Sequence, residues 1–166
     1  LKTTSLEGTK VNLAYPLMSS IKDDDRTIGM GNIDLISAYH IDEIVKRVKI
    51  LKREFPSKMV AASIMSGSKD GWKILVKMLK DAGVDLIECS FSCPQGNIGE
   101  DPGKMLAQSE SATERAATWV KEAAGNLPVL IKITPQVTDI VAIAKAVRRS
   151  GCDGITASNS MPALMG

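Results

Sequence analysis

Cysteine is scarce in this sequence of 166 residues, and its three cysteines show no pairing pattern. Cys89, Cys93 and Cys152 are odd in number and lack a Cys-x-x-Cys spacing. Such a pattern argues against a disulfide framework, a zinc site and a four-cysteine iron–sulfur cluster contained in this chain. We therefore expect reduced thiols and predict no metal site.

Long apolar runs and an excess of one charge are missing as well. No segment approaches the roughly 18 apolar residues that a membrane span needs, and the N-terminal segment lacks the layout of a signal peptide. The 21 basic and 19 acidic residues are interspersed, so no basic stripe indicates nucleic acid. These absences favour a cytoplasmic protein that binds neither membranes nor nucleic acid.

Short β-branched runs alternate with helical patterns along the chain, which is the signature of βα units around a parallel sheet. We expect strands near residues 59–64, 84–91, 128–133 and 153–157. Helices are expected at 41–54 and at 70–82.

Two further helices are predicted from their capping residues. Ser111 and Glu114 form a capping-box pattern before a helix that ends at Gly125. Thr138 is the expected N-cap of a helix that ends at Gly151.

Three of the expected strands end in residues that can carry chemistry. Residues 87–96 read Ile-Glu-Cys-Ser-Phe-Ser-Cys-Pro-Gln-Gly, so a hydrophobic strand leads into a serine, a thiol and a proline. Residues 129–135 read Val-Leu-Ile-Lys-Ile-Thr-Pro, and residues 153–160 read Asp-Gly-Ile-Thr-Ala-Ser-Asn-Ser. Polar residues that follow successive strands in this way indicate the edge of an active site.

These segments resemble the flavin-containing barrel domain of dihydropyrimidine dehydrogenase, within the dihydroorotate dehydrogenase superfamily. The resemblance covers the whole chain, and its most specific parts lie at residues 92–94, 132–140 and 153–159. It implies an α/β fold of the TIM (β/α)8 barrel type and a flavin mononucleotide (FMN) cofactor.

A complete barrel takes about 250 residues, whereas four clear strands and a possible fifth at residues 1–4 can be counted here. We therefore expect residues 1–166 to form a partial FMN-binding TIM-barrel domain, a fragment of a longer enzyme. The resemblance implies that the first strand and the last two lie outside this sequence, together with the loops that hold the flavin phosphate.

The connection after the second clear strand is the longest, with its surplus at about residues 94–110. Loops longer than about 12–15 residues in compact domains are usually functional or disordered, and they gather at the carboxyl ends of barrel strands. We interpret Gln95 to Ser109 as a lid over the site, to which Gly96, Gly99 and Gly103 give mobility.

Cys93 is the first catalytic candidate, because it directly follows a buried strand, precedes a proline and faces the expected lid. The resemblance implies that reduced flavin gives a hydride to one carbon of a pyrimidine double bond while this thiol protonates the neighbouring carbon. A thiol with an ordinary pKa near 8.5 is mostly protonated at neutral pH, as this role requires. The alternative is a small buried hydrophobic residue, the usual fate of a lone cysteine.

Lys132 is the clearest physical anomaly, because its apolar neighbours imply burial on both faces of a strand. An unpaired buried ammonium is costly, so we expect Lys132 to have a partner. The resemblance places it at the flavin, where positive charge offsets the charge of the reduced ring. The alternative is a structural ion pair with Glu88 or another carboxylate.

The resemblance also matches Lys2, followed by Thr3, to a second flavin contact, although the residues alone leave Lys2 an ordinary solvated lysine. It assigns recognition of the pyrimidine to Asn32, Ser90, Phe91, Ser92, Asn159 and Ser160. Amide side chains suit this task because they supply both a donor and an acceptor to the alternating N–H and C=O groups of the ring edge. Asn32 could equally be a turn residue, because Gly-Asn pairs commonly are.

Several positions depart from the family pattern. Ser90 stands where the family has asparagine, and Ser160 stands where threonine is usual. Glu100, Asp101 and Pro102 also differ from a glycine-rich lid. These departures leave open which ring is reduced.

We interpret the chain as part of an FMN-dependent oxidoreductase that interconverts a uracil-like or thymine-like pyrimidine and its 5,6-dihydro form. It carries no dinucleotide-binding glycine motif and no cluster cysteines. The resemblance therefore implies an electron-transfer partner subunit or domain with FAD, iron–sulfur clusters and the NAD(P) site, and a homo-oligomer is also expected. A dihydroorotate dehydrogenase-like flavoenzyme and a non-catalytic flavin-binding or structural subunit are the alternatives.

Overall fold

The computed structural model of the chain describes residues 1–11, 16–93 and 105–162. In chain order, its elements are β1 (Met18–Asp23), β2 (Arg26–Asn32), α1 (Ile41–Glu54), β3 (Ala61–Ile64), α2 (Lys69–Ala82), β4 (Leu86–Ser90), the 3-10 helix η1 (Leu106–Gln108), α3 (Glu110–Ala124), β5 (Val129–Lys132), α4 (Ile140–Arg149) and β6 (Gly154–Thr156). None of the helices in these three ranges has the length and apolar character needed to cross a membrane.

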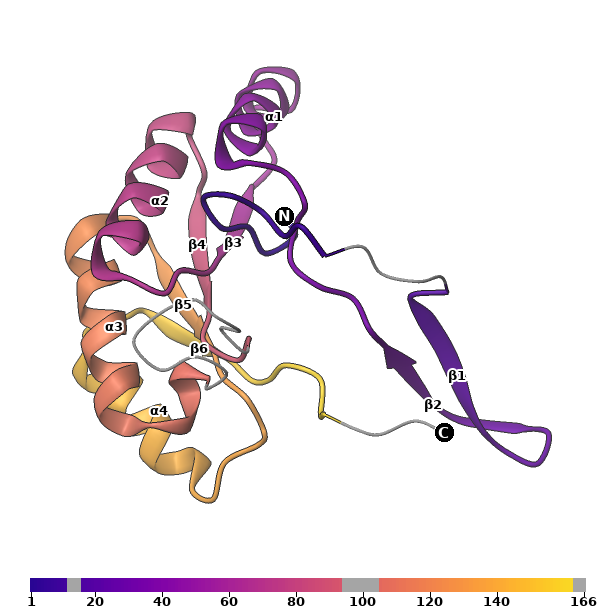
Figure 1. The fold of residues 1–166 in the computed structure, drawn as a ribbon. Coiled ribbons are helices and arrows are strands. Elements are labelled where there is room, and N and C mark those ends of the chain that lie inside the picture. Colours follow the sequence, from indigo (N-terminus) through magenta and orange to yellow (C-terminus); the bar gives the residue numbers. More distant parts are fainter. Residues whose placement is uncertain (12–15, 94–104, 163–166) are drawn as a thin grey trace.

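The four expected strands form one parallel sheet in the order β3-β4-β5-β6. The helices pack on one side of this sheet (Figure 1). The start of the chain lies beside β3, because Thr4 forms a parallel bridge with Ile64 and the Leu1 ammonium donates to the Ala61 carbonyl oxygen at 2.7 Å. The possible strand at residues 1–4 is thus confirmed as a short bridge. The result is an open arc, an incomplete TIM barrel, as expected.

The hydrophobic core lies between this sheet and its helices. Ile87, Cys89 and Ile131 point toward the helices and are fully buried. On the helix side, the buried partners include Trp72, Leu75, Val76, Leu79 and Val120. Since successive residues of a strand point to opposite faces, the alternate residues of β3 to β6 lie on the face that the helices leave open.

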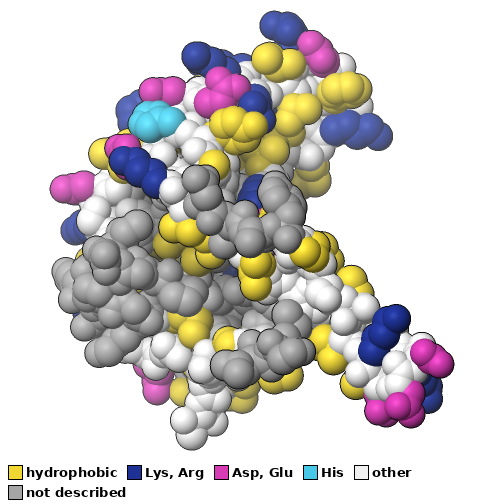
Figure 2. All heavy atoms as spheres, turned by 45° about the vertical axis from the view of Figure 1, so that its right-hand side comes forward, with side chains coloured by type: hydrophobic (Ala, Val, Ile, Leu, Met, Phe, Trp, Pro, Cys, Tyr) yellow, Lys and Arg dark blue, Asp and Glu magenta, His cyan; other side chains and the backbone are white. Residues whose placement is uncertain are grey.

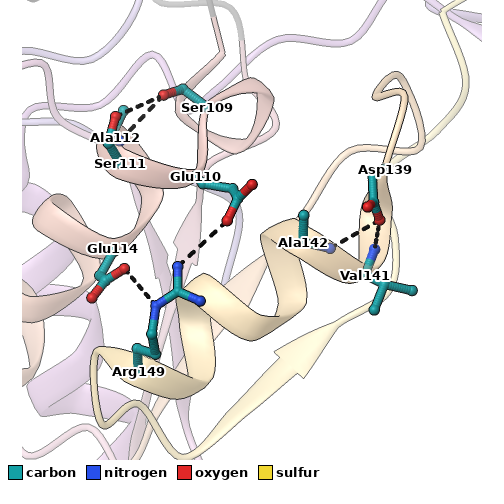
Figure 3. Close-up of polar contacts among 9 residues, drawn as sticks. All are labelled: Ser109, Glu110, Ser111, Ala112, Glu114, Asp139, Val141, Ala142 and Arg149. Carbon is teal, nitrogen blue, oxygen red and sulfur yellow. Dashed lines mark hydrogen bonds and ion pairs between the residues drawn. The ribbon is translucent and has the colours of Figure 1, made fainter.

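Helix ends follow the expected chemistry, with two corrections (Figure 3). The N-cap of α3 is Ser109 and not Ser111, because the Ser109 side chain accepts from the Ala112 N–H. Ser109 leaves the preceding 3-10 turn in an extended conformation, as an N-cap must. The N-cap of α4 is Asp139 and not Thr138: its carboxylate accepts from the two backbone N–H groups of Val141 and Ala142.

A repeated corner precedes β4 and β6, where the sequence runs Gly-Val-Asp at 83–85 and Gly-Cys-Asp at 151–153. In each corner the aspartate carboxylate accepts one hydrogen bond from a backbone N–H at the start of the neighbouring strand and another from a lysine on a helix. Asp85 binds the Val60 N–H at 2.7 Å and Lys52 at 2.8 Å. Asp153 binds the Val129 N–H at 2.8 Å and Lys121 at 2.7 Å. These hydrogen bonds hold the pKa of both carboxyl groups below the ordinary value.

The antiparallel hairpin β1–β2 is absent from the sequence-based expectations. It extends away from the sheet (Figure 1), and Figure 2 shows charged side chains gathered on a separate lobe at its tip. Met18, Ile28 and Met30 are each about 60% exposed. Its turn contains Asp24 at φ 49° in place of the usual Asn-Gly signal. Because the hairpin buries neither face, it has no clean apolar alternation to recognise.

Candidate active site

The open face of the sheet carries a row of polar side chains. The register pairs Ser63 with Glu88, Ser90 with Lys132, and Lys132 with Thr156. Paired residues of parallel strands point to the same face, so all five side chains lie opposite the helix-covered core. We call this set, Ser63, Glu88, Ser90, Lys132 and Thr156, the polar face.

Two hydrogen bonds organise the polar face. At one side, the Thr3 and Ser63 hydroxyl groups lie 2.8 Å apart. At the other, the Thr156 hydroxyl donates to Glu88 Oε2 at 2.9 Å. Sequence reasoning did not find Ser63 or Thr156, although both have the strand parity of Lys132 once the register is known.

Lys132 corrects an expectation, because it is only half-buried and has no buried counter-ion. Among the residues that the structure describes, its ammonium group makes neither an ion pair nor a hydrogen bond. The alternative, a structural ion pair with Glu88, is not formed among the described residues. Glu88 instead accepts a hydrogen bond from Thr156. The apolar neighbours of Lys132 cover only the helix side of the strand, while the polar face leaves its ammonium group accessible.

Cys93 lies just beyond the carboxyl end of β4, next to the segment that follows β6. The Asn159 side-chain N–H donates to the Ser92 carbonyl oxygen at 3.3 Å, and the Asn159 backbone N–H donates to the Ile133 carbonyl oxygen at 3.0 Å. The structure thus brings together three segments that the sequence analysis had grouped.

Ser92 and Cys93 sit in an enclosed environment at this edge. Ser92 is 2% exposed, and its hydroxyl oxygen has no hydrogen-bond partner within the described part of the chain. Cys93 is half-buried, and this burial raises the pKa of its thiol above the ordinary value. Burial therefore favours the neutral thiol over the thiolate.

Phe91 contributes its ring to the core and not to the polar face. The ring is 1% exposed and lies 5.4 Å from the Trp72 ring, centroid to centroid. Its backbone N–H donates to the Lys132 carbonyl oxygen, and its carbonyl oxygen accepts from Ala107. The side chain of Phe91 is therefore turned away from the place assigned to a substrate.

The end of the expected lid packs on the same edge. Met105 is 8% exposed and Ala107 is fully buried, and Gln108 donates to the Gln136 carbonyl oxygen. The preceding lid positions, which include Gly96, Gly99, Gly103 and residues 100–102, lie outside the described residues.

Lys2 and Asn32 are held by Asp34, a residue that the sequence analysis did not select. Lys2 forms an ion pair with Asp34 at 2.7 Å, with both side chains about half exposed, and this hydrogen bond lowers the pKa of Asp34. The Asn32 side-chain oxygen accepts from the Asp34 N–H at 3.2 Å, at the last residue of β2. Ser160, the remaining predicted site residue, is exposed.

No group of three or more His, Cys, Asp and Glu residues within the described ranges is placed to hold a metal ion. The three cysteines are free thiols.

Comparisons with known proteins show which family this chain belongs to. The family model described as dihydroorotate dehydrogenase matches residues 27–165. The NAD-dependent dihydropyrimidine dehydrogenase subunit PreA of Escherichia coli K12 is 35% identical over 87% of this chain and 34% of that protein. The chloroplastic dihydropyrimidine dehydrogenase (NADP(+)) of Arabidopsis thaliana is 33% identical over 99% of this chain and 40% of that protein.

More distant matches include one further curated relative and one solved structure. Dihydroorotate dehydrogenase A (fumarate) of Limosilactobacillus reuteri is 28% identical over 82% of this chain and 42% of that protein. Among solved structures, dihydrodipicolinate synthase from Oceanobacillus iheyensis superposes with a TM-score of 0.53 at 19% identity, over 74% of this chain and 37% of that one. This last likeness concerns the fold alone.

The chain spans between 34% and 42% of the length of these curated relatives. The family model nevertheless covers most of the chain. The motifs that carry the resemblance lie at or beyond the carboxyl ends of β4, β5 and β6, at one edge of the sheet. The chain belongs to the dihydroorotate dehydrogenase family.

Proposed function

We propose that this chain is the central part of an FMN-dependent enzyme that interconverts a pyrimidine and its 5,6-dihydro form. The observation that carries the proposal is the contact between the two segments that bear Cys93 and Asn159. The hydrogen bond from Asn159 to the Ser92 carbonyl oxygen fixes the amide against the residue that precedes Cys93, at the edge where β5 ends with Lys132. The names of two relatives above 30% identity, both dihydropyrimidine dehydrogenases, support this substrate class.

The residues present fit a flavin. Lys132 offers an ammonium group without a partner in the described part of the chain, on an open face with hydroxyl groups around it. Positive charge at the edge of a reduced flavin ring stabilises the charge that develops there. Lys132 would therefore hold the ring edge, with Lys2 and Thr3 as further contacts, while FMN would supply hydride transfer to or from the substrate.

Cys93 would hold the proton of the reaction at its Sγ atom. In the reducing direction it gives this proton to a ring carbon, and in the oxidising direction it takes the proton back. General acid catalysis by a positioned group contributes about 10²–10⁴-fold in rate. The raised pKa of Cys93 suits the acid, because the thiol remains protonated.

Asn159 would read the pyrimidine edge, with Ser90, Ser92 and Ser160 nearby and Asn32 from the hairpin. The buried Ser92 hydroxyl, which has no partner in the described residues, is free to hydrogen-bond a ligand. Ser90 is shorter than the asparagine of the family pattern, so it offers fewer hydrogen bonds to the ring. The missing amide contact would leave room for a larger substituent on a uracil-like or thymine-like ring.

The electrons would come from a partner subunit or domain with FAD, iron–sulfur clusters and an NAD(P) site. One relative is itself described as a subunit of an NAD-dependent enzyme. Purification of the full-length protein together with any bound partner subunit, followed by cofactor analysis, tests this part of the proposal. The mass of the purified complex also tests whether the protein is a homo-oligomer.

An anaerobic visible spectrum of the full-length protein tests the activity. We expect a flavin band that bleaches when dihydrouracil or dihydrothymine is added, and dihydroorotate added in parallel tests the alternative substrate. A colourless protein would overturn the flavin assignment, and bleaching by dihydroorotate alone would overturn the assignment of a uracil-like or thymine-like substrate.

A Cys93→Ser variant tests the proton donor. We expect its bleaching rate to fall at least about 100-fold while FMN stays bound, because only the group that accepts the substrate proton in this oxidising direction is lost. Cys152→Ser is the matched control: this thiol is also half-buried but contacts the Ala117 carbonyl oxygen in the helix layer. Equal rates in the wild type and Cys93→Ser would contradict the role of Cys93.

A further inference from the structure

The hydrogen bond between Glu88 and Thr156 crosses the middle of the polar face. Glu88 belongs to β4 and Thr156 to β6, and β5 lies between these strands. Glu88 pairs with Leu130, whereas Thr156 pairs with Lys132 two residues further along β5. The 2.9 Å bond therefore passes over β5 between Leu130 and Lys132, next to the base of the lysine side chain.

The Glu88 carboxylate and the Lys132 ammonium group are neighbours that do not form an ion pair. Diagonal neighbours on one face of a sheet lie about 7–8 Å apart at their Cα atoms, within reach of long side chains. Glu88 and Lys132 could therefore meet, yet Thr156 holds the carboxylate instead. Lys132 keeps its ammonium group unpaired within the described residues, and both groups are only half-buried.

We propose that Glu88 is a positioning residue for Lys132, and that Thr156 keeps its carboxylate from neutralising the lysine. This inference rests on the function proposed above, in which Lys132 binds the flavin edge. The negative charge of Glu88 at fixed distance moderates how strongly Lys132 favours the reduced flavin. Thr156 sets that distance, so the two residues have opposite effects on the flavin when they are changed.

The test is the ratio of the affinities for reduced and oxidised FMN, obtained from the midpoint potential of the flavin in the full-length protein. Glu88→Gln removes the charge but keeps an oxygen for Thr156, and we expect the ratio to rise about tenfold because Lys132 is no longer opposed. Thr156→Val frees the carboxylate to pair with Lys132, so the ratio should fall. Thr156→Ser keeps the hydroxyl and should match the wild type.

The double variant Glu88→Gln/Thr156→Val separates this role from a purely structural one. With no charge at position 88, the valine should leave the ratio at the value of Glu88→Gln alone. FMN binding to the apoprotein, followed by fluorescence, gives a second readout without turnover: we expect Thr156→Val to bind FMN more weakly than Thr156→Ser.

The outcomes distinguish the two proposals. A wild-type protein that binds no FMN overturns the proposed function and this inference with it. If the wild type binds FMN, two results overturn the role of Glu88 alone. One is an unchanged ratio of the two FMN affinities in Glu88→Gln, and the other is a shift of equal sign in Glu88→Gln and Thr156→Val. If Glu88→Gln does not fold, the comparison of Thr156→Val with Thr156→Ser still decides: equal ratios overturn the inference.

Discussion

At the scale of the residue, the protonation of Cys93 sets the pH range of the proposed reaction. Burial disfavours the thiolate and therefore raises the pKa of this group. The acid form thus persists to higher pH than in a free thiol, whose pKa is about 8.5. We expect the rate of pyrimidine reduction to stay level from about pH 7 to pH 8.5 and to fall only above that range.

A pH profile of kcat checks this expectation, with an ultraviolet titration of thiolate in the wild type and in Cys93→Ser as the control. The difference between the two titrations isolates the Cys93 ionisation. A half-loss of rate below pH 8, with a matching thiolate signal, would show that the thiol is activated and not merely buried.

Ser90 is the residue at which substrate preference should respond. It is 8% exposed on the polar face, paired with Lys132 in the register. Ser90→Asn introduces an amide that can both donate and accept toward a pyrimidine edge. We expect kcat/KM for uracil to rise about tenfold relative to a 5-substituted pyrimidine. Ser57→Asn, in the exposed turn after α1, is the control, and an unchanged ratio in Ser90→Asn would remove Ser90 from the recognition site.

At the scale of the element, the two Gly-x-Asp corners anchor the starts of β4 and β6. The pKa of Asp85 is lowered by its hydrogen bonds to Lys52 and the Val60 N–H. A carboxyl group with a depressed folded-state pKa stabilises the fold above its unfolded pKa of about 3.9, and this stabilisation is lost as pH falls through the folded-state value. Asp85→Asn should therefore lower the free energy of unfolding by about 1 kcal/mol at pH 7, a figure reduced for partial exposure.

Denaturant unfolding at pH 7 and near pH 3 measures this effect, and the difference between variant and wild type should shrink at the lower pH. Asp81→Asn is the matched control, because its partner Lys77 lies one turn away on an exposed helix face, where ion pairs contribute little. Equal effects of the two variants would mean that the corner has no special role.

At the scale of the whole molecule, the sheet and the hairpin should differ in local stability. Strands β4 and β5 have a neighbour on each side and a covered face, whereas the β1–β2 hairpin extends away from the core (Figure 1). Local opening costs least where few apolar contacts are buried, and an isolated two-stranded hairpin is marginal in water. We expect amides around Ile87 and Ile131 to exchange much more slowly with solvent than those of Ile28 and Met30.

Hydrogen exchange followed by mass spectrometry, resolved by peptide, tests this prediction. Helix α2, whose buried side contacts the sheet, is an internal reference for strong protection. Hairpin amides as slow as those of β4 would mean that another part of the protein covers the hairpin.

The sequence by itself determined the elements of the barrel arc and the family. Strand and helix periodicity and the glycine endings of helices are local, so residues within one turn or one strand are enough to show them. The Ser-Cys-Pro at 92–94 and the segment around Lys132 identified the candidate edge in the same way. The choices between Ser109 and Ser111, and between Thr138 and Asp139, were missed because neighbouring residues offered similar caps and the backbone conformation selected one.

Only the tertiary structure decided which side chains share a face and which partners they take. The bond of Glu88 to Thr156 joins residues 68 positions apart, and that of Asn159 to Ser92 spans 67. Such contacts depend on how the strands pair across the sheet, and no short stretch of sequence shows that pairing. The same holds for Lys132, because its apolar neighbours show that one side of the strand is buried, and the sheet alone shows that the other side is open.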